Sequence, residues 1–237
     1  MSGHSKWATT HRQKAVVDAK RGAVFTRMAN VITIAARTGG DPDSNPSLRA
    51  AVDRARSVSM PKDNIERAIK KGTGELGGAQ VEELSYEAVG PNGLQLIVRC
   101  ITDNKNRSAS TVRHTLSKYG VNFGNVMWNF ELKGVIMVEQ KALADKNLSS
   151  EDLELELIDV GLEDMKTEIE GVTLYCRVEN LNQLKIFLEK KGLQIESASI
   201  EYVAKDKINL DDTSSLDKMF EELEDNEDVS DYYSNLA

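Results

Sequence analysis

The sequence predicts an α+β protein of three domains: an N-terminal helical bundle and two α/β domains, one ferredoxin-like and inserted into the other. Apolar residues recur at helical spacing in the first part of the chain and at strand spacing after a glycine-rich segment at 72–80. The elements after Gly134 follow the order βαββαβ, which is typical of the ferredoxin-like fold. The predicted domains are 1–79, 80–133 together with 205–237, and 134–204.

Three short helices are expected in the first domain. Phe25, Met28, Ile32 and Ala35 give the first helix an apolar face, and Gly39 and Gly40 end it. Asn45 and Pro46 have the pattern of an N-cap followed by proline at the first helical position. A break at Met60 and Pro61 separates the second helix from the third, which ends at Gly72. The glycine-rich segment that follows is the clearest predicted linker.

The remaining elements are predicted mainly as strands with helices between them. Leu84–Val89 and Leu94–Ile101 flank Gly90-Pro91-Asn92-Gly93, a strong hairpin signal. A helix at 106–119, a strand at 126–132 and a C-terminal helix carrying Leu216, Phe220 and Leu223 complete the middle domain, before a short tail with few apolar residues. The inserted domain is predicted as strand 135–139, helix 150–160, strands 164–169 and 172–178, helix 180–191 and strand 194–203.

Composition places the chain among globular proteins. It has 237 residues, of which 40% are hydrophobic, and a net charge of −8. No window is apolar enough for a membrane span, and the N-terminus has no apolar secretory core. Cys100 and Cys176 have no metal-ligand or redox spacing, and we expect both to be reduced core thiols. We therefore expect a cytoplasmic protein.

The charge is strongly segregated along the chain. Residues 1–80 hold 14 basic and seven acidic side chains, and within residues 1–40 the only acid is Asp18. Residues 211–237 hold ten acidic side chains and one basic one. A basic head on an acidic body favours nucleic acid as a partner of the head alone. The acidic C-terminal segment is open to three interpretations: it contacts the basic head in place of nucleic acid, contacts a basic partner, or acts as a solubilising tail.

Ten residues are candidates for nucleic-acid contact. In the arm before the first helix, cations alternate with one tryptophan, which suits phosphate contact together with stacking on a base; the alternative is that Trp7 folds back on the bundle. Lys20 and Arg27, and likewise Arg49 and Arg56, are seven residues apart and share a helix face, although a solvated face explains any one of them equally well. The candidates are Lys6, Trp7, His11, Arg12, Lys14, Lys20, Arg21, Arg27, Arg49 and Arg56.

The sequence contains no recognisable motif of an enzyme active site. His4, His11 and His114 lack partners at zinc-ligand or catalytic-triad spacing, and neither a phosphate loop nor GxGxxG is present. We therefore predict no catalytic residue, no metal, no cofactor and no small-molecule substrate.

Several long runs of the sequence resemble the YebC family, which includes the mitochondrial translational activator of cytochrome c oxidase. The runs are the opening GHSKW, DAKRG at 18–22, GGDPDSNPSLRAAVDRAR at 39–56, MPKDNIERAIKKGTGE at 60–75 and Asp103-Asn104-Lys105-Asn106-Arg107. Tyr86-Glu87, Gly90-Pro91 and Lys133-Gly134-Val135-Ile136 also fit, so the resemblance covers essentially the whole chain. It implies a helical head followed by two α/β domains.

The resemblance also implies a regulator of gene expression, because members are generally described as probable transcriptional regulators and some act in translation on the ribosome. We therefore predict a non-enzymatic, DNA-binding transcriptional regulator. The alternatives are a translation factor bound to ribosomal RNA, and an acidic protein–protein adaptor. The sequence leaves the oligomeric state undetermined.

Overall fold

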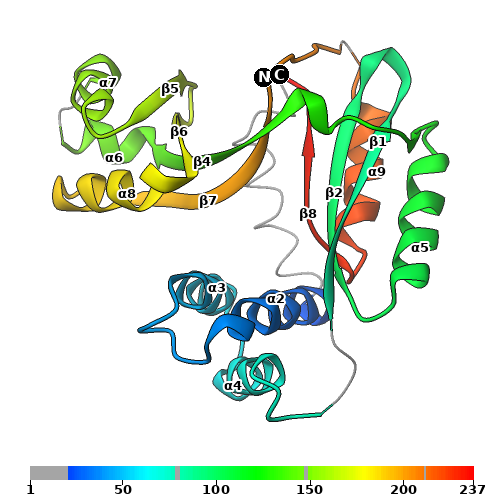
Figure 1. Cartoon of the computed structure of the whole chain (residues 1–237). Helices are drawn as coiled ribbons and strands as arrows, with labels where there is room; N and C mark the ends of the chain where they lie inside the picture. Colours follow the sequence, from blue (N-terminus) through cyan, green and yellow to red (C-terminus); the bar gives the residue numbers. More distant parts are fainter. Residues whose placement is uncertain (1–20, 78–80, 147–148, 211) are drawn as a thin grey trace. The chain divides into compact units, whose positions relative to one another are not determined.

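The computed structural model describes residues 21–77, 81–146, 149–210 and 212–237 and gives the backbone alone for 21 and 150–152. It confirms the α+β class, with helices packed on two four-stranded antiparallel sheets (Figure 1). The described chain forms two compact units. One contains residues 21–126 and Ile208–Ala237, and the other contains Met127–Lys207. None of the helices in the described segments is long and apolar enough to cross a membrane.

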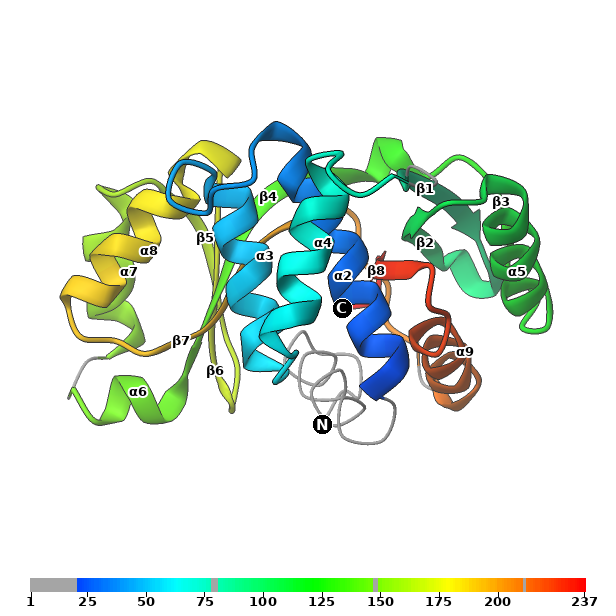
Figure 2. The same ribbon diagram turned by 90° about the horizontal axis from the view of Figure 1, so that it is seen from below.

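The first unit begins with the expected bundle of three helices, α2 (Arg21–Ala35), α3 (Pro46–Ser57) and α4 (Lys62–Gly72). Helix α2 packs against both α3 and α4, and Figure 2 shows the three helices side by side. Asn45 caps α3 as predicted, because its Oδ1 accepts a hydrogen bond from the Leu48 amide at 3.1 Å. The same side chain donates to the carbonyls of Ala35 and Gly39, both at 2.8 Å, so it also fixes the turn between α2 and α3.

The first sheet joins segments that are far apart in the sequence. Strands β1 (Glu82–Val89) and β2 (Gln95–Thr102) form the predicted hairpin around a 3₁₀ turn at Pro91–Gly93. The sheet order is β3-β1-β2-β8, with β3 at Asn122–Phe123 and β8 at Val229–Ser234. Helices α5 (Lys105–Ser117) and α9 (Ser214–Glu224) supply side chains to a core of thirteen buried residues beside these strands.

Strand β8 differs from the prediction, which treated the segment after α9 as a short tail. It pairs antiparallel with β2, with Ile97 opposite Tyr233 and Arg99 opposite Asp231. Val229 is buried in the core, and the ring of Tyr232 stacks on Phe220 with centroids 4.8 Å apart. These aromatic and β-branched side chains suit a strand, and the surrounding acids concealed the pattern.

The second unit contains a sheet of order β5-β6-β4-β7. The chain passes through a 3₁₀ turn at Met127–Asn129, β4 (Phe130–Glu139), α6 (Gln140–Ala144), α7 (Ser150–Ile158), β5 (Leu162–Thr167), β6 (Gly171–Cys176), a 3₁₀ turn at Val178–Asn180, α8 (Leu181–Lys190) and β7 (Ile195–Ala204). Apart from the short α6, this is the predicted βαββαβ order, and the strand arrangement is ferredoxin-like.

Strand β4 corrects the expectation of two strands separated at Gly134. It runs unbroken through the glycine and pairs with β7 from Phe130 opposite Ala204 as far as Val138 opposite Ile195. A Cβ atom on Gly134 would lie 2.7 Å from the Cys176 sulfur and 2.9 Å from Leu181 Cβ. The glycine therefore marks a close approach within the unit, and not the end of a strand. The three-domain division stays a prediction that deletion experiments can test.

Candidate nucleic-acid interface

More than half of the predicted contact residues precede the part of the chain that the structure describes. Lys6, Trp7, His11, Arg12, Lys14 and Lys20 lie outside the described residues, and Arg21, the first residue of α2, is described by its backbone alone. Arg27, Arg49 and Arg56 have described side chains, and these fall into two environments.

Arg27 is held against the acidic C-terminal segment. Its side chain is part-buried on α2, and its Nη2 donates a hydrogen bond to the Glu224 carbonyl at the end of α9. Burial lowers the pKa of the Arg27 guanidinium, and the Asp231 carboxylate opposes that shift. In this arrangement Arg27 joins the bundle to the α/β part of the first unit, which we call the body (residues 81–126 and 208–237).

Three further contacts join the bundle to the body. Arg54 on α3 forms an ion pair with Asp231 on β8 at 3.5 Å. Asn30 on α2 donates from Nδ2 to the Ile101 carbonyl at 3.4 Å, and Arg37 donates to the Val81 carbonyl. The glycine-rich segment after α4 therefore does not leave the bundle independent of the body.

Arg49 and Arg56 lie on the opposite flank of α3. At about 100° per residue, each lies about 140–160° around the helix axis from Arg54. Arg49 donates to the Pro42 carbonyl at 3.0 Å and pairs with Asp43 at 3.3 Å, whereas Arg56 pairs with Asp53 at 3.4 Å. All of these side chains are more than half exposed, and such pairs contribute only about 0–1 kcal/mol. A phosphate could replace either carboxylate at little cost.

Helix α4 adds three cations that the sequence analysis missed. Arg67, Lys70 and Lys71 are exposed, and none forms an ion pair with any described residue. Their spacing of three and four residues places them on one face of the C-terminal half of the helix. The sequence carries this signal, but basic residues in the last turn of a helix also complement the helix dipole, so Lys70 and Lys71 do not by themselves indicate a binding surface.

The acids of α4 lie nearer its N-terminus. Asp63 is in the first turn, and Glu66 pairs with Lys62 at 3.5 Å. The positive surface of α4 is therefore confined to its second half. A groove-reading helix usually presents its N-terminal residues to base edges, so this charge pattern suits backbone contact better than base readout.

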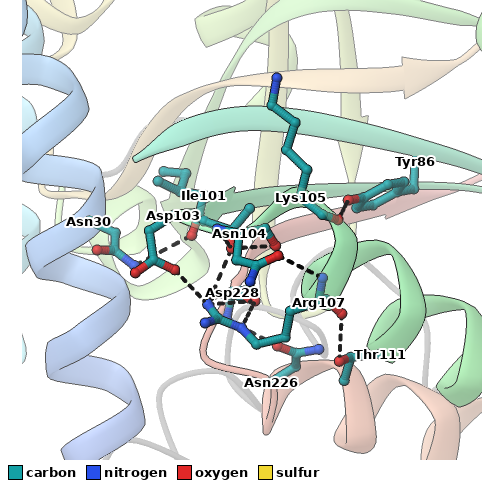
Figure 3. Close-up of polar contacts among 11 residues, drawn as sticks. Asn30, Tyr86, Ile101, Asp103, Asn104, Lys105, Arg107, Thr111, Asn226 and Asp228 are labelled. Carbon is teal, nitrogen blue, oxygen red and sulfur yellow. Dashed lines mark hydrogen bonds and ion pairs between the residues drawn. The ribbon is translucent and has the colours of Figure 1, made fainter. Parts of the chain in front are cut away.

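Asp103-Asn104-Lys105-Asn106-Arg107 forms a structural junction at the start of α5 (Figure 3). Asn104 caps the helix, since its Oδ1 accepts from the Arg107 amide at 3.0 Å. The Arg107 guanidinium donates to Asp103 Oδ1 at 2.8 Å and to Asp228 Oδ1 at 3.0 Å. These hydrogen bonds, with Asp228 the stronger influence, raise the pKa of Arg107.

This junction positions the bundle and does not itself present a positive surface. Asp228 lies in the turn between α9 and β8, three residues before Asp231. Figure 3 shows Asn30 of α2 directed at the Ile101 carbonyl beside the same cluster. The motif thus fixes the turn that leads to Asp231, and a bundle helix contacts the adjacent strand end.

Comparisons with known proteins cover nearly the whole chain. Residues 5–75 match the TACO1/YebC protein N-terminal domain, and residues 81–236 match the TACO1/YebC second and third domain. A "probable transcriptional regulatory protein" of Halothermothrix orenii is 42% identical over all of this chain and 95% of its own length, and one of Chlorobaculum tepidum is 44% identical with the same coverage. The crystal structure of a conserved hypothetical protein from Aquifex aeolicus matches with a TM-score of 0.79 and 39% identity, covering 93% of this chain and 92% of that one. The chain belongs to the TACO1/YebC family.

Proposed function

We propose that this protein is a non-enzymatic regulator of gene expression that binds the phosphate backbone of nucleic acid through its bundle and N-terminal arm. The observation that carries the proposal is a set of five exposed cations on parts of α3 and α4 that make no described contact with the body. They are Arg49, Arg56, Arg67, Lys70 and Lys71. Cations placed this way neutralise phosphates and release counterions.

DNA is the favoured target, because curated relatives are named as probable transcriptional regulatory proteins. Ribosomal RNA presents the same phosphates, so the test includes both nucleic acids. The predicted contact residues of the arm remain part of the proposed surface, together with Lys20 and Arg21: they are Lys6, Trp7, His11, Arg12 and Lys14. Arg27 does not belong to this exposed set, since it is engaged with Glu224.

The test replaces Arg67, Lys70 and Lys71 together with glutamine in the full chain. Binding to a random-sequence DNA duplex and to an RNA strand is measured at several salt concentrations. Each lost phosphate contact removes about 0.9 from the slope of log affinity against log salt for duplex DNA. The triple variant should therefore lose about 2–3 from that slope, with an unchanged unfolding midpoint.

A matched control removes the same charge elsewhere. Lys141, Lys185 and Lys190 are exposed on α6 and α8 of the second unit, and their replacement with glutamine should leave the slope unchanged. Equal loss of slope in both triple variants would show that net charge alone governs binding. Absence of salt-dependent binding by the wild-type chain would refute the proposed function outright.

A further inference from the structure

Three arginines surround one carboxylate where the bundle meets the body. Arg54 of α3 pairs with Asp231 at 3.5 Å. Arg99, whose guanidinium also forms an ion pair with Glu83, lies directly opposite Asp231 on the neighbouring strand β2. Arg27 of α2 is the third, close enough for its charge to influence the carboxylate. Proteins commonly bind phosphate with arginine side chains whose guanidinium groups point toward one place.

The three arginines influence the pKa of the Asp231 carboxyl group. Burial alone would raise the pKa of this carboxyl group. Arg54 and Arg99, a hydrogen bond from Ser230 and the charge of Arg27 together outweigh burial and lower the pKa. An anion is therefore stabilised at this position although much of its hydration is lost.

The contact is also of a kind that can be exchanged. The Arg54 side chain is 48% exposed and that of Asp231 is 23% exposed, so solvent reaches the pair. Arg27 Nε is buried and has no hydrogen-bond partner among the described residues, which weakens the packed state. Interfaces between parts of one chain that rest on such polar contacts behave like transient interfaces.

We infer that Asp231 occupies, within the same chain, a latent phosphate site formed by Arg27, Arg54 and Arg99, and that a nucleic-acid phosphate competes with it. The inference rests on the proposed function, because it names an internal competitor of the nucleic acid. The acidic C-terminal segment thereby has a specific target, the basic head of the same chain. From the sequence alone, contact with a basic partner and a solubilising role were equally open.

The exchange has a thermodynamic consequence. If phosphate and Asp231 exclude one another, weakening the internal contact strengthens nucleic-acid binding, by at most the factor by which that contact is weakened. Arg54 then contributes little to binding while Asp231 is present and contributes fully when the carboxylate is absent. If the ion pair is purely structural and phosphate does not compete with it, the contribution of Arg54 to binding should not depend on whether Asp231 is present.

The test is a double-mutant cycle in the full chain, with Asp231→Asn, Arg54→Ala and both together, using a random-sequence DNA duplex as the probe. Asp231→Asn should steepen the salt slope by about 0.9 for each phosphate newly bound. Arg54→Ala should barely change the slope in the wild-type background and should abolish the gain in the Asp231→Asn background. Equal effects of Arg54→Ala in both backgrounds would overturn the inference.

Two controls separate the possible failures. Glu221→Gln removes one negative charge from an exposed position in the same acidic segment, and it should not steepen the slope. If Glu221→Gln and Asp231→Asn act alike, the effect is general repulsion and the latent site does not exist. If the wild type shows the slope expected of the five exposed cations but the cycle is additive, the proposed function stands and the inference fails.

The inference also has a readout that needs no mutation of the arginines. Addition of the same duplex should increase hydrogen exchange of the β8 amides in the wild type, because Asp231 then loses its ion pair with Arg54 and β8 is held less firmly. In Asp231→Asn these amides should already exchange faster before DNA is added. Unchanged β8 exchange at saturating DNA would contradict the competition.

Discussion

At the scale of single residues, the polar side chains around α5 and β8 mostly position other groups. Asn104 holds the first turn of α5, and Arg107 ties that turn to Asp228. In the sequence, both residues were used only as part of a run that resembles the YebC family. The Asn104 cap follows the same local pattern as the Asn45 cap, whereas the partner of Arg107 is 121 residues away and only the structure shows it. Their roles are structural, and their effects should appear in stability.

The Asn104 cap gives the first prediction at this scale. Asn104→Ala removes the acceptor for the Arg107 amide and should lower the free energy of unfolding by about 1 kcal/mol. Asn104→Ser keeps a capping oxygen and should restore most of that loss. Urea unfolding of the two variants measures the difference, and equal loss in both would show that the side chain stabilises the protein in another way.

Asp231 gives a prediction about pH. Its pKa lies below the ordinary value of 3.8 in the folded protein, so its ionised form stabilises the fold. That stabilisation is complete above pH 3.8 and is lost as pH falls through the lower, folded-state pKa. Asp231→Asn should therefore be less stable than the wild type near neutral pH, and the difference should shrink below about pH 4. A difference in urea midpoint that is constant from neutral to strongly acidic pH would exclude this linkage.

At the scale of elements, the most reliable sequence signals were local. The Asn45 cap, the breaks between the bundle helices and the hairpin between β1 and β2 were confirmed, since adjacent residues determine them. The glycine cap expected at Gly72 was wrong, because Gly72 is the last helical residue and the positive φ belongs to Gly74. Gly134 was misread because a glycine that permits close packing looks the same in sequence as one that ends a strand. Strand β8 was missed because its partner β2 lies more than a hundred residues earlier.

Gly134 therefore supplies a prediction for β4. Gly134→Ala would place a methyl group within 3 Å of Cys176 and Leu181 and should destabilise the protein by about 1–3 kcal/mol. Gly77→Ala is the matched control, because no atom of the described residues, apart from its chain neighbours, lies within 4 Å of the added Cβ, and its effect should stay within about 0.5 kcal/mol. Thermal unfolding of the two variants decides whether Gly134 is a packing residue.

The sequence predicted that the interface is basic and where along the chain it lies, but it did not predict all of the residues that form it. Segregated charge identified the bundle as the basic part, which the exposed cations of α3 and α4 fit. Charge alone did not separate Arg27 and Arg54, which contact the body, from Arg49 and Arg56 on the other side. That distinction depends on the positions of α9 and β8 relative to the bundle, which the charge pattern does not show.

At the scale of the whole molecule, each of the two units has its own apolar core. Twelve buried residues form the core of the second unit, and separate clusters of thirteen and eleven lie in the body and the bundle. The bundle core is small and lies beside polar contacts to the body. Its stability should consequently depend on the body, whereas the second unit contains all four strands of its sheet.

The second unit should therefore fold alone. A fragment of residues 127–207 should unfold cooperatively on heating, because every element that covers its core is present. Circular dichroism of the fragment measures this, and a broad, non-cooperative transition would show that the unit depends on the rest of the chain. The same fragment should not bind duplex DNA.

The pairing of β8 with β2 has a consequence for biosynthesis. The first sheet lacks an edge strand until residues 229–234 have been added, whereas the second unit can fold before that segment is translated. During that interval one edge of β2 has no strand beside it and can pair with other nascent chains. A premature stop codon at or just before the start of β8 would make that exposure permanent. A truncating lesion that removes β8 should therefore cause aggregation as well as loss of function.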